Sequence, residues 1–596
     1  MTATAVTGDS MDSDSKVLLN FKSYFESWNP TERGMLNEWK TEKQDVCQWP
    51  GITYCTISGP LFSSFSSLTQ LTFLDLSSNT IKGSIPDDLS CCHNLKHLNL
   101  SLNIIGGELS LSGLSNLEVL DLLVNKIVGD VHSSFPLLCN SLVVANLSNN
   151  NTGRIDDIFN ECRYLKYMTF STNKFSRDIP ETLLNLRNLL FLDLSKNNFG
   201  GDIQEIFGRF TQVKYLVLHG NLYVGGIYSS NILTLPNLSR LDLSYNNFSG
   251  WLPSKISQIQ TLDLSFNRLT GSLPDTFGKL TSLLWLMLAN NSLSGEIPRE
   301  IGNCSSLLWF NVENNQLSGG FHPELTKMGS NPILFQHLKV PSFHIWIRNL
   351  YKKSCRSLWD HLLKSKCIFP VCPAGSMVRL LDLSGYLQLS GNKLSGEVPA
   401  NISQMKKLSM LHLGFNEFQG KLPIEIGQLP LVFLNLTRNQ LSVQIPQEIG
   451  NLKSLQNLDL SYNNFSRNFP TSLDGLSELS KFNISYNPFI SGVIPSRGQL
   501  ATLEKDSFLE NPLLQLPSFF DQSGDSNLSS GERGNGREEE EDEAAIDMLA
   551  FYWSTSSFNL VALIGIQVLM YFDCPWCRAW LHLVDAFMAS LKSMLS

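Results

Sequence analysis

A short motif recurs through most of the chain at a nearly constant interval. In 71-LTFLDLSSN-79 leucines stand at Leu71, Leu74 and Leu76 and are followed by Asn79, and the same spacing returns over residues 95–103. Most successive copies are 23–25 residues apart. A fixed period of this size predicts a solenoid, in which each unit contacts only its neighbours and one core runs through all of them.

The asparagine that closes each motif marks about sixteen units. The two leucines of L-x-L point to the same face of a short strand, because side chains alternate along a strand. Strands of successive units then form a parallel sheet, and each asparagine can turn inward to bond neighbouring backbone groups. The pattern predicts an α/β solenoid with a parallel β-sheet on its concave face. The asparagines are Asn79, Asn103, Asn125, Asn150, Asn173, Asn197, Asn221, Asn246, Asn267, Asn291, Asn315, Asn392, Asn416, Asn439, Asn463 and Asn487.

Most units continue after the asparagine as in 291-NSLSGEIPREIGNCSSL-307, where Gly295 permits a turn and Pro298 ends the extended piece. This LSGxIP continuation resembles the plant-specific class of leucine-rich repeats. Upstream, 47-CQWPGITYC-55 is similar to the N-terminal cap of that family. The resemblance covers roughly residues 14–515, and it implies a disulfide between Cys47 and Cys55 and a Trp49 that covers the first repeat.

The repeat is interrupted between Asn315 and Asn392, which are 77 residues apart, so roughly fifty residues are extra. The segment 327–377 has no repeat pattern and is too apolar for a plain linker. Its position resembles the island domain of the brassinosteroid and phytosulfokine receptor kinases, in which the island helps to form the ligand site. Within that subfamily the chain is most similar to the nematode-induced leucine-rich repeat receptor-like kinases. The alternative is an error in the gene structure at this point.

Large outward side chains gather on the strands that flank the interruption. Trp285 and Trp309 occupy the same register in consecutive units, which places them roughly 5 Å apart. Aromatic groups exposed together predict an apolar recognition patch with polar tips, although the rings could equally anchor the island. Steroid-like and short-peptide ligands both suit such a patch. The predicted ligand-binding residues are Trp285, Met287, Trp309, Asn311, Tyr386, Met410, His412 and Phe433.

Other chemical functions find little support in the sequence. The net charge is -9 and no basic stripe is present, which argues against nucleic-acid binding. No nucleophile–base constellation, metal-ligand spacing or phosphate loop stands out, and the glycine-rich, HRD and DFG motifs of a kinase are missing. We therefore expect no catalytic residues, no metal and no cofactor. His97, His219 and His412 fall at repeat positions, and we expect them at the surface.

Glycosylation signals and the cap cysteines favour the secretory pathway. The cap disulfide would require an oxidising compartment, although residues 1–21 do not read as a secretory signal. We therefore expect a true start upstream of Met1 or a lost exon. The N-x-S/T acceptors expected to carry glycans are Asn99, Asn146, Asn237, Asn247, Asn303, Asn401, Asn464 and Asn483.

The last part of the chain changes character. Residues 521–545 are polar and acidic, and residues 548–572 carry no charge over 25 residues, which is long enough to span a bilayer. The cysteines of 574-CPWC-577 lack the setting of a redox motif. The predicted domains are 14–60, N-terminal cap; 61–323, about eleven repeats; 324–386, island insertion; 387–497, about five repeats; 498–547, end segment and acidic linker; 548–572, possible transmembrane helix; and 573–596, short tail.

Together these features predict a cell-surface receptor-like protein of the plasma membrane with extracellular repeats. It would bind a small hormone-like or peptide ligand on the concave face near the island and signal through a co-receptor kinase. Two alternatives remain at this point: a truncated receptor kinase or its non-functional remnant, and a secreted wall protein similar to polygalacturonase inhibitors. The insertion argues against the second alternative, because those inhibitors resemble shorter arrays without one.

Overall fold

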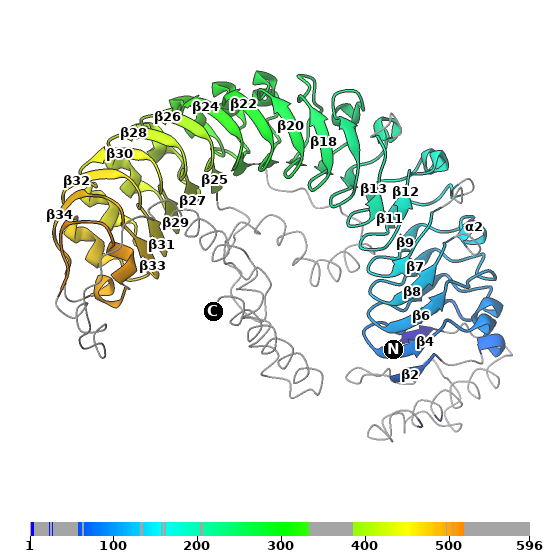
Figure 1. The fold of residues 1–596 in the computed structure, drawn as a ribbon. Helices are drawn as coiled ribbons and strands as arrows, with labels where there is room; N and C mark the ends of the chain where they lie inside the picture. The colour runs from blue at the N-terminus through cyan, green and yellow to red at the C-terminus, as the bar shows by residue number, and fades with distance from the viewer. Residues whose placement is uncertain are drawn as a thin grey trace, which may run out of the picture. The chain divides into compact units, whose positions relative to one another are not determined.

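The computed structural model describes residues 2–4, 23, 27, 58–61, 65–131, 135–155, 159, 162–202, 207–332, 385–495, 498–503 and 505–517. In this part the chain repeats one arrangement: a short strand, a turn, a second strand and, in most units, a short helical turn. Figure 1 shows the units stacked side by side in chain order. The predicted leucine-rich repeat solenoid is confirmed.

The first strands of the units form one continuous parallel sheet, and β1 (Thr2–Thr4) joins it antiparallel to the first of them. Most neighbouring strands pair residue for residue, as Leu74 does with Leu98, but the register between β25 and β27 shifts by one residue between Gly385 and Tyr386. The strands are β3 (Phe73–Asp75), β5 (His97–Asn99), β7 (Val119–Asp121), β9 (Val144–Asn146), β11 (Tyr167–Thr169), β13 (Phe191–Asp193), β15 (Tyr215–Val217), β17 (Arg240–Asp242), β19 (Thr261–Asp263), β21 (Trp285–Met287), β23 (Trp309–Asn311), β25 (Gly385–Gln388), β27 (Leu408–His412), β29 (Phe433–Asn435), β31 (Asn457–Asp459) and β33 (Lys481–Asn483).

A second strand follows each turn, and these strands pair in parallel with their counterparts in neighbouring units. Gly295 has a φ of 78° inside β22, a conformation that favours glycine. The strands are β2 (Ser58–Pro60), β4 (Thr80–Gly83), β6 (Ile104–Glu108), β8 (Lys126–Gly129), β10 (Asn151–Thr152), β12 (Ser176–Arg177), β14 (Asn198–Phe199), β16 (Val224–Gly226), β18 (Asn247–Gly250), β20 (Arg268–Gly271), β22 (Ser292–Glu296), β24 (Gln316–Gly320), β26 (Lys393–Gly396), β28 (Glu417–Gly420), β30 (Gln440–Val443), β32 (Asn464–Asn468), β34 (Phe489–Val493) and β35 (Leu513–Gln515).

Short helices complete most units, and many begin directly after a proline, as η9 does after Pro298. Nearly all of them are 3₁₀ turns, the form that suits three to five residues. They are η3 (Phe65–Ser67), η4 (Asp87–Cys91), α2 (Phe135–Leu138), η5 (Glu181–Asn185), η6 (Phe207–Arg209), η7 (Ile232–Thr234), η8 (Asp275–Lys279), η9 (Arg299–Asn303), η10 (Pro323–Lys327), η12 (Ala400–Gln404), η13 (Ile424–Gln428), η14 (Gln447–Asn451), η15 (Thr471–Gly475), η16 (Gln499–Thr502) and η17 (Lys505–Phe508).

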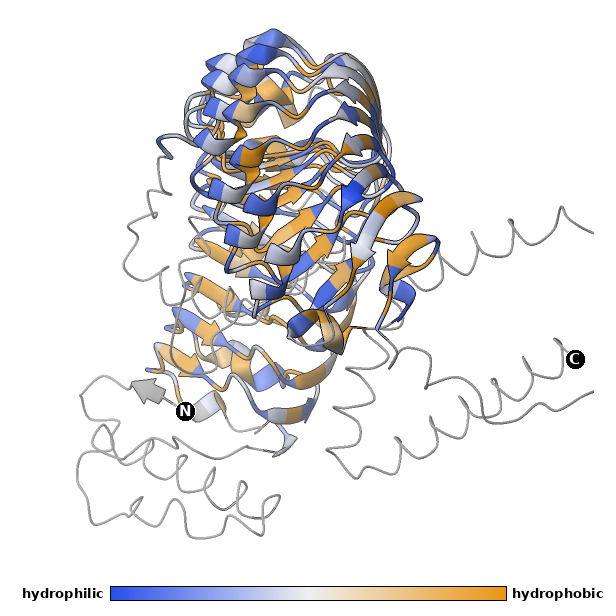
Figure 2. Cartoon of the chain, turned by 90° about the vertical axis from the view of Figure 1, so that its left-hand side faces the viewer, coloured by the Kyte–Doolittle hydropathy of each residue, from blue (hydrophilic) through white to orange (hydrophobic). Residues whose placement is uncertain are grey.

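The core lies between these layers and consists mainly of the motif leucines. Leu98 and Leu100 are completely buried, and their counterparts in the other units are buried in the same way. Figure 2 shows apolar and polar positions alternating in each unit and repeating from one unit to the next. Each buried leucine contributes about 1.5–3 kcal/mol relative to exposure, so the repeated leucines supply the main driving force for stacking.

The motif asparagines hold the units together, as the sequence predicts. Asn103 Nδ2 donates to the carbonyl oxygens of Leu76 and Leu100, each at 3.0 Å, and its Oδ1 accepts from the Ile81 N–H at 3.0 Å. The same bonds recur along the array, so each buried amide links its own strand to the preceding unit. These bonds satisfy backbone groups that would otherwise be buried without partners.

The array extends beyond the last unit that the leucine spacing predicts. Asn511 Nδ2 donates to the Ile484 carbonyl at 3.1 Å, and Asn511 Oδ1 accepts from the Asn487 N–H at 2.7 Å. β35 then pairs with β34. Residues up to 515 therefore continue the stack, although the segment lacks the L-x-x-L-x-L spacing.

Several sequence predictions concern residues outside the described part: the cap cysteines Cys47 and Cys55, the segment 548–572 and most of the insertion. Among the described residues, no helix combines the length and the apolar character needed to cross a bilayer. Repeat structure includes η10 and resumes at Gly385. Residues 324–327 and 385–386, which were predicted to belong to the insertion, are therefore part of repeat elements, and residues 333–384 lie outside the described part of the chain.

The structure contains a disulfide that the sequence did not indicate, between Cys139 and Cys162. The two residues are 23 positions apart and their Cα atoms are 4.1 Å apart. They occupy equivalent positions, each three residues before a buried leucine. This bond links two consecutive units covalently.

Candidate ligand-binding site

Two rows of side chains run across the outward face of the sheet from β13 to β29. Each strand contributes two residues, one on either side of its buried central residue, because alternate residues share a face. The first row is Phe191, Tyr215, Arg240, Thr261, Trp285, Trp309, Tyr386, Met410 and Phe433, and the second row is Asp193, Val217, Asp242, Asp263, Met287, Asn311, Gln388, His412 and Asn435.

Ring side chains on β21 to β29 contact one another in sequence, and we call them the aromatic row: Trp285, Trp309, Tyr386, His412 and Phe433. Successive ring centroids are 5.8, 5.3, 5.8 and 6.4 Å apart. Trp285 pairs directly with Trp309, as the sequence register predicts. Aromatic pairs at these distances contribute about 0.5–1.5 kcal/mol each beyond burial, so the row is a preorganised surface.

The centre of the aromatic row is strongly buried. Trp309 is 4% exposed and Tyr386 is 2% exposed, whereas Trp285 and Phe433 at the two ends are half-buried. The other predicted site residues lie beside them: Met287 and Met410 are buried, and Asn311 accepts a hydrogen bond from the Glu313 N–H at 2.9 Å. The sheet thus brings all eight predicted ligand-binding residues onto adjacent strands.

His412 is not a fully exposed surface residue, as the sequence suggested, but half-buried with a desolvated ring. Burial lowers the pKa of His412 to about 4, so its imidazole is neutral at physiological pH. Within the described part of the chain, its buried Nε2 atom has no hydrogen-bond partner, and neither has the buried hydroxyl of Ser390. The aromatic row is therefore uncharged and offers neutral hydrogen-bonding groups at its edge.

The second chemically distinct group on this face is the acidic stretch, which we define as Asp193, His219, Asp242 and Asp263 on β13 to β19. His219, only 5% exposed, lies just after β15, and its Nδ1 is 3.2 Å from Asp242 Oδ2. The surface position expected for His219 is therefore wrong. Burial favours a low pKa for His219, but the neighbouring Asp242 and Asp193 carboxylates outweigh it and raise the pKa above its ordinary value.

The three carboxyls of the acidic stretch differ in their titration. Burial raises the pKa of Asp193 above its ordinary value. Burial acts on Asp242 too, but His219 beside it holds the pKa of Asp242 well below the usual range. Burial and the nearby Asp242 charge raise the pKa of Asp263 to about 7, against partial compensation by hydrogen bonds from Ser265. One carboxyl is thus paired, and two are desolvated.

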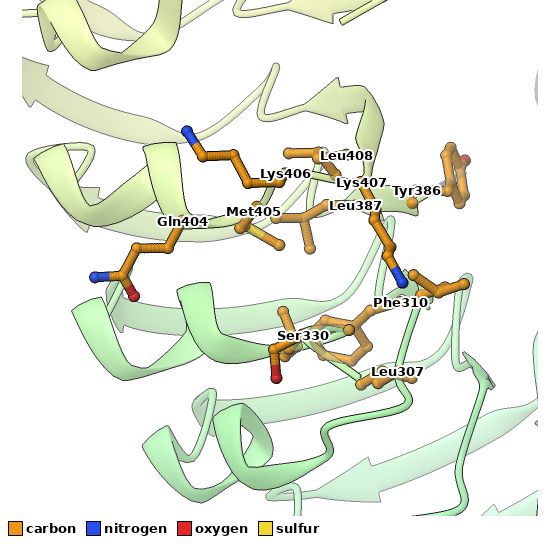
Figure 3. Close-up of a pocket in the computed structure, with 14 residues that line it drawn as sticks. Leu307, Phe310, Ser330, Tyr386, Leu387, Gln404, Met405, Lys406, Lys407 and Leu408 are labelled. Carbon is orange, nitrogen blue, oxygen red and sulfur yellow. The ribbon is translucent and has the colours of Figure 1, made fainter. Parts of the chain in front are cut away.

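A pocket of about 160 Å³ lies where the array resumes after the insertion. Figure 3 shows Leu387, Met405 and Leu408 on one side of it and Leu307 and Phe310 on the other. Gly385 lies close to the backbone of the next unit, where an added Cβ would be 3.2 Å from Leu408 Cα and 3.2 Å from the Lys407 carbonyl oxygen. The remaining residues that line the pocket are Leu308, Met328, Gly329, Ser330, Gly385, Tyr386, Gln404, Lys406 and Lys407. The pocket therefore has apolar walls with polar and basic groups beside them.

The acidic stretch was missed because it depends on contacts between units. One signal was present in the sequence: His219 stands where Ser195 and Ser244 stand in the adjoining units. The described residues contain no group of three or more His, Cys, Asp or Glu side chains arranged to hold a metal ion. The arrangement on this face is suited to binding.

Comparisons with known sequences agree with this architecture. A leucine rich repeat N-terminal domain matches residues 11–53, and leucine rich repeat models match residues 257–317 and six further segments between 70 and 476. The chain is 58% identical over 685 residues to a probable LRR receptor-like serine/threonine-protein kinase of Arabidopsis thaliana, covering 88% of this chain and 62% of that protein. It is also 56% identical over 92 residues to Receptor like protein 21 of the same plant, covering 15% of this chain and 9% of that protein.

Solved structures of plant receptors resemble this chain in fold. The plant peptide hormone receptor RGFR1 in complex with RGF2 matches with a TM-score of 0.64 at 30% identity, covering 78% of this chain and 66% of that one. The Arabidopsis receptor kinase HAESA, in complex with the peptide hormone IDA and the co-receptor SERK1, matches with a TM-score of 0.52 at 26% identity. The match covers 78% of this chain and 77% of that one.

The fold and the repeat sequence define a leucine-rich repeat protein. The chain belongs to the plant leucine-rich repeat receptor-like kinases and receptor-like proteins and corresponds to their ectodomain. It spans 62% of the length of the Arabidopsis receptor-like kinase that it matches.

Proposed function

We propose that this chain is the extracellular ligand-binding part of a plant cell-surface receptor and that the aromatic row binds the ligand. The observation that carries the proposal is the unbroken contact of five ring side chains across adjacent strands. A rigid, desolvated aromatic surface binds apolar groups with little loss of conformational entropy. Matched receptors that were solved with peptide hormones favour a peptide ligand over a small hormone-like molecule.

The receptor would act at the plasma membrane with its repeats outside the cell and would signal through a co-receptor kinase. Support comes from the relatives: one is a probable receptor-like kinase, and the HAESA structure contains a co-receptor. The pocket between the units of β23 and β25 would receive an apolar group of the ligand.

Selection from a random dodecapeptide display library tests the ligand proposal. The full chain is compared with a double variant, Trp309→Ala with Tyr386→Ala, and with the matched control Trp251→Ala, whose ring is 60% exposed after β18. Melting temperatures establish that each variant is folded before binding is measured. We expect peptides that bind the full chain and the control but lose at least about tenfold in affinity for the double variant, as central aromatic residues of binding sites do. Equal binding to all three chains would overturn the proposal.

Entry into the secretory pathway is a separate test. Asn237, Asn303, Asn401 and Asn464 are exposed and can accept glycans. Asn146 is completely buried and donates to Asp121 at 2.9 Å, so the fold does not allow a glycan there. We expect the chain, tagged at its C-terminus and expressed in plant cells, to gain gel mobility after glycosidase treatment. An unchanged mobility would contradict an extracellular location.

A further inference from the structure

The acidic stretch and the aromatic row are two parts of one surface. Asp263 on β19 pairs in register with Met287 on β21, and Thr261 pairs with Trp285. The rows therefore pass from one stretch into the other without a break. A ligand seated on the aromatic row and extending toward lower residue numbers would lie over the acidic stretch.

Among the described residues, two carboxyls of the acidic stretch, Asp193 and Asp263, feel the charge of His219 but form no ion pair of their own. His219 is engaged by Asp242. Asp193 accepts hydrogen bonds from the Ser195 N–H and hydroxyl at 2.9 and 2.6 Å, and Asp263 accepts from the Ser265 N–H at 2.9 Å. Neither of these carboxyls forms an ion pair with a basic side chain of the described residues, although each is largely desolvated.

A second, independent feature at the same place points to a missing partner. Thr261 is 5% exposed, and in the described part of the chain its hydroxyl has no hydrogen-bond partner. It lies two residues before Asp263 on the same face of β19 and beside Trp285. A buried hydroxyl normally has a partner, so a donor or acceptor from a bound molecule fits here.

The basic groups near this place are already engaged or peripheral. Half-buried Arg240 on β17 pairs in register with Thr261, and its charge helps to lower the pKa of Asp242. Lys196, exposed in the turn after β13, acts on His219. With His219 protonated, Asp242 is neutralised. Asp193 and Asp263 remain as the positions at which an added cation would be favourable.

We infer that the ligand is a peptide with a basic side chain against Asp193 or Asp263 and an apolar or aromatic side chain against the aromatic row. This inference rests on the proposed function. Neighbouring strands are about 4.8 Å apart, so Trp309 is roughly 10 Å along the sheet from Asp263 and roughly 24 Å from Asp193. An extended peptide advances about 3.3 Å per residue, which puts the basic and apolar residues about three to seven positions apart.

The same dodecapeptide library tests this inference with a second pair of variants. Asp193→Asn with Asp263→Asn removes both unpaired carboxylates and keeps the side-chain shape. Asp459→Asn is the matched control, because Asp459 on β31 is half-buried in the same row position and bonds Ser461 in the same way. Melting temperatures establish that each variant is folded before it is used.

We expect peptides selected on the full chain to carry Arg or Lys three to seven residues from Trp, Phe or Leu. Replacing that basic residue by Gln in a selected peptide should weaken binding about tenfold on the full chain and on Asp459→Asn, and less than about twofold on the double Asn variant. Aromatic enrichment without a basic residue, or equal losses on all three chains, overturns the inference and leaves the proposed function standing. No enrichment, or enrichment that ignores the aromatic row, overturns both.

Discussion

The acidic stretch and the aromatic row lie on strands of one sheet, yet the histidine in each of them has its pKa shifted in the opposite direction. His219 lies among carboxylates, which raise its pKa. His412 lies among aromatic rings, and burial lowers its pKa to about 4. His219 stands two residues after β15, and His412 is the last residue of β27. In both places the direction of the pKa shift depends on the side chains that the adjoining units place beside the imidazole.

The largest effect is expected from the centre of the aromatic row. Trp309→Ala removes a ring that is 4% exposed and contacts Trp285 and Tyr386, and it should cost about 3–5 kcal/mol of unfolding free energy. The exposed Trp251→Ala should stay within about 0.5 kcal/mol of the unsubstituted chain. Urea denaturation of both variants measures the difference. Similar midpoints would show that the row does not contribute to the packing of the sheet.

The acidic stretch should respond strongly to loss of its one ion pair. Asp242→Asn leaves His219 buried without its carboxylate, which should cost about 3 kcal/mol. Asp459→Asn, which disturbs no ion pair of the described residues, is the control and should cost much less. Chemical denaturation at pH 6, where His219 is protonated, gives the comparison. An equal cost for the two substitutions would mean that the His219–Asp242 contact contributes no stability.

A smaller effect should appear in the pH dependence of the acidic stretch. The pKa of Asp263 is raised to about 7 in the fold, so folded Asp263 keeps a proton that the unfolded chain releases near pH 4. Its contribution to stability therefore falls as the pH rises from about 4 to 7. Asp263→Asn should melt roughly 2–4 °C higher than the unsubstituted chain at pH 8, and the gap should close near pH 4. A gap that is independent of pH would contradict this assignment.

The smallest effect, with the opposite sign, is expected at His412. Its pKa is lowered from 6.5 to about 4. Between these pH values the imidazole is protonated in the unfolded chain and neutral in the folded chain. The free energy of unfolding therefore falls as the pH falls from 6.5 to about 4. His412→Gln should remove that loss and melt slightly higher than the unsubstituted chain at pH 4.5, with no difference at pH 8. Thermal melts of both proteins at pH 4.5 and pH 8 test this prediction. A difference in melting temperature at pH 8 would mean that the substitution acts through packing and not through protonation.

The sequence predicted those features that depend on spacing within a unit. Leucine and asparagine positions defined the strands, and counting from them put Trp285 opposite Trp309. Features that arise between units were harder to predict. His219 looked like a surface residue because its burial depends on neighbouring units, and Asn511 was missed because its unit lacks the leucine spacing. The Cys139–Cys162 bond joins equivalent positions one period apart, so comparing units position by position would have suggested it.

The even spacing of the strands has a consequence for how such proteins change. Adjacent strands are separated by a nearly fixed step of about 4.8 Å, so the distance between two groups on the sheet is set by the number of units between them. Inserting one whole unit between β19 and β21 would move the acidic stretch relative to the aromatic row by one step and leave the side chains of both intact. Under the proposed function, such an insertion would change the length of the molecule that is recognised without changing either of the groups that recognise it.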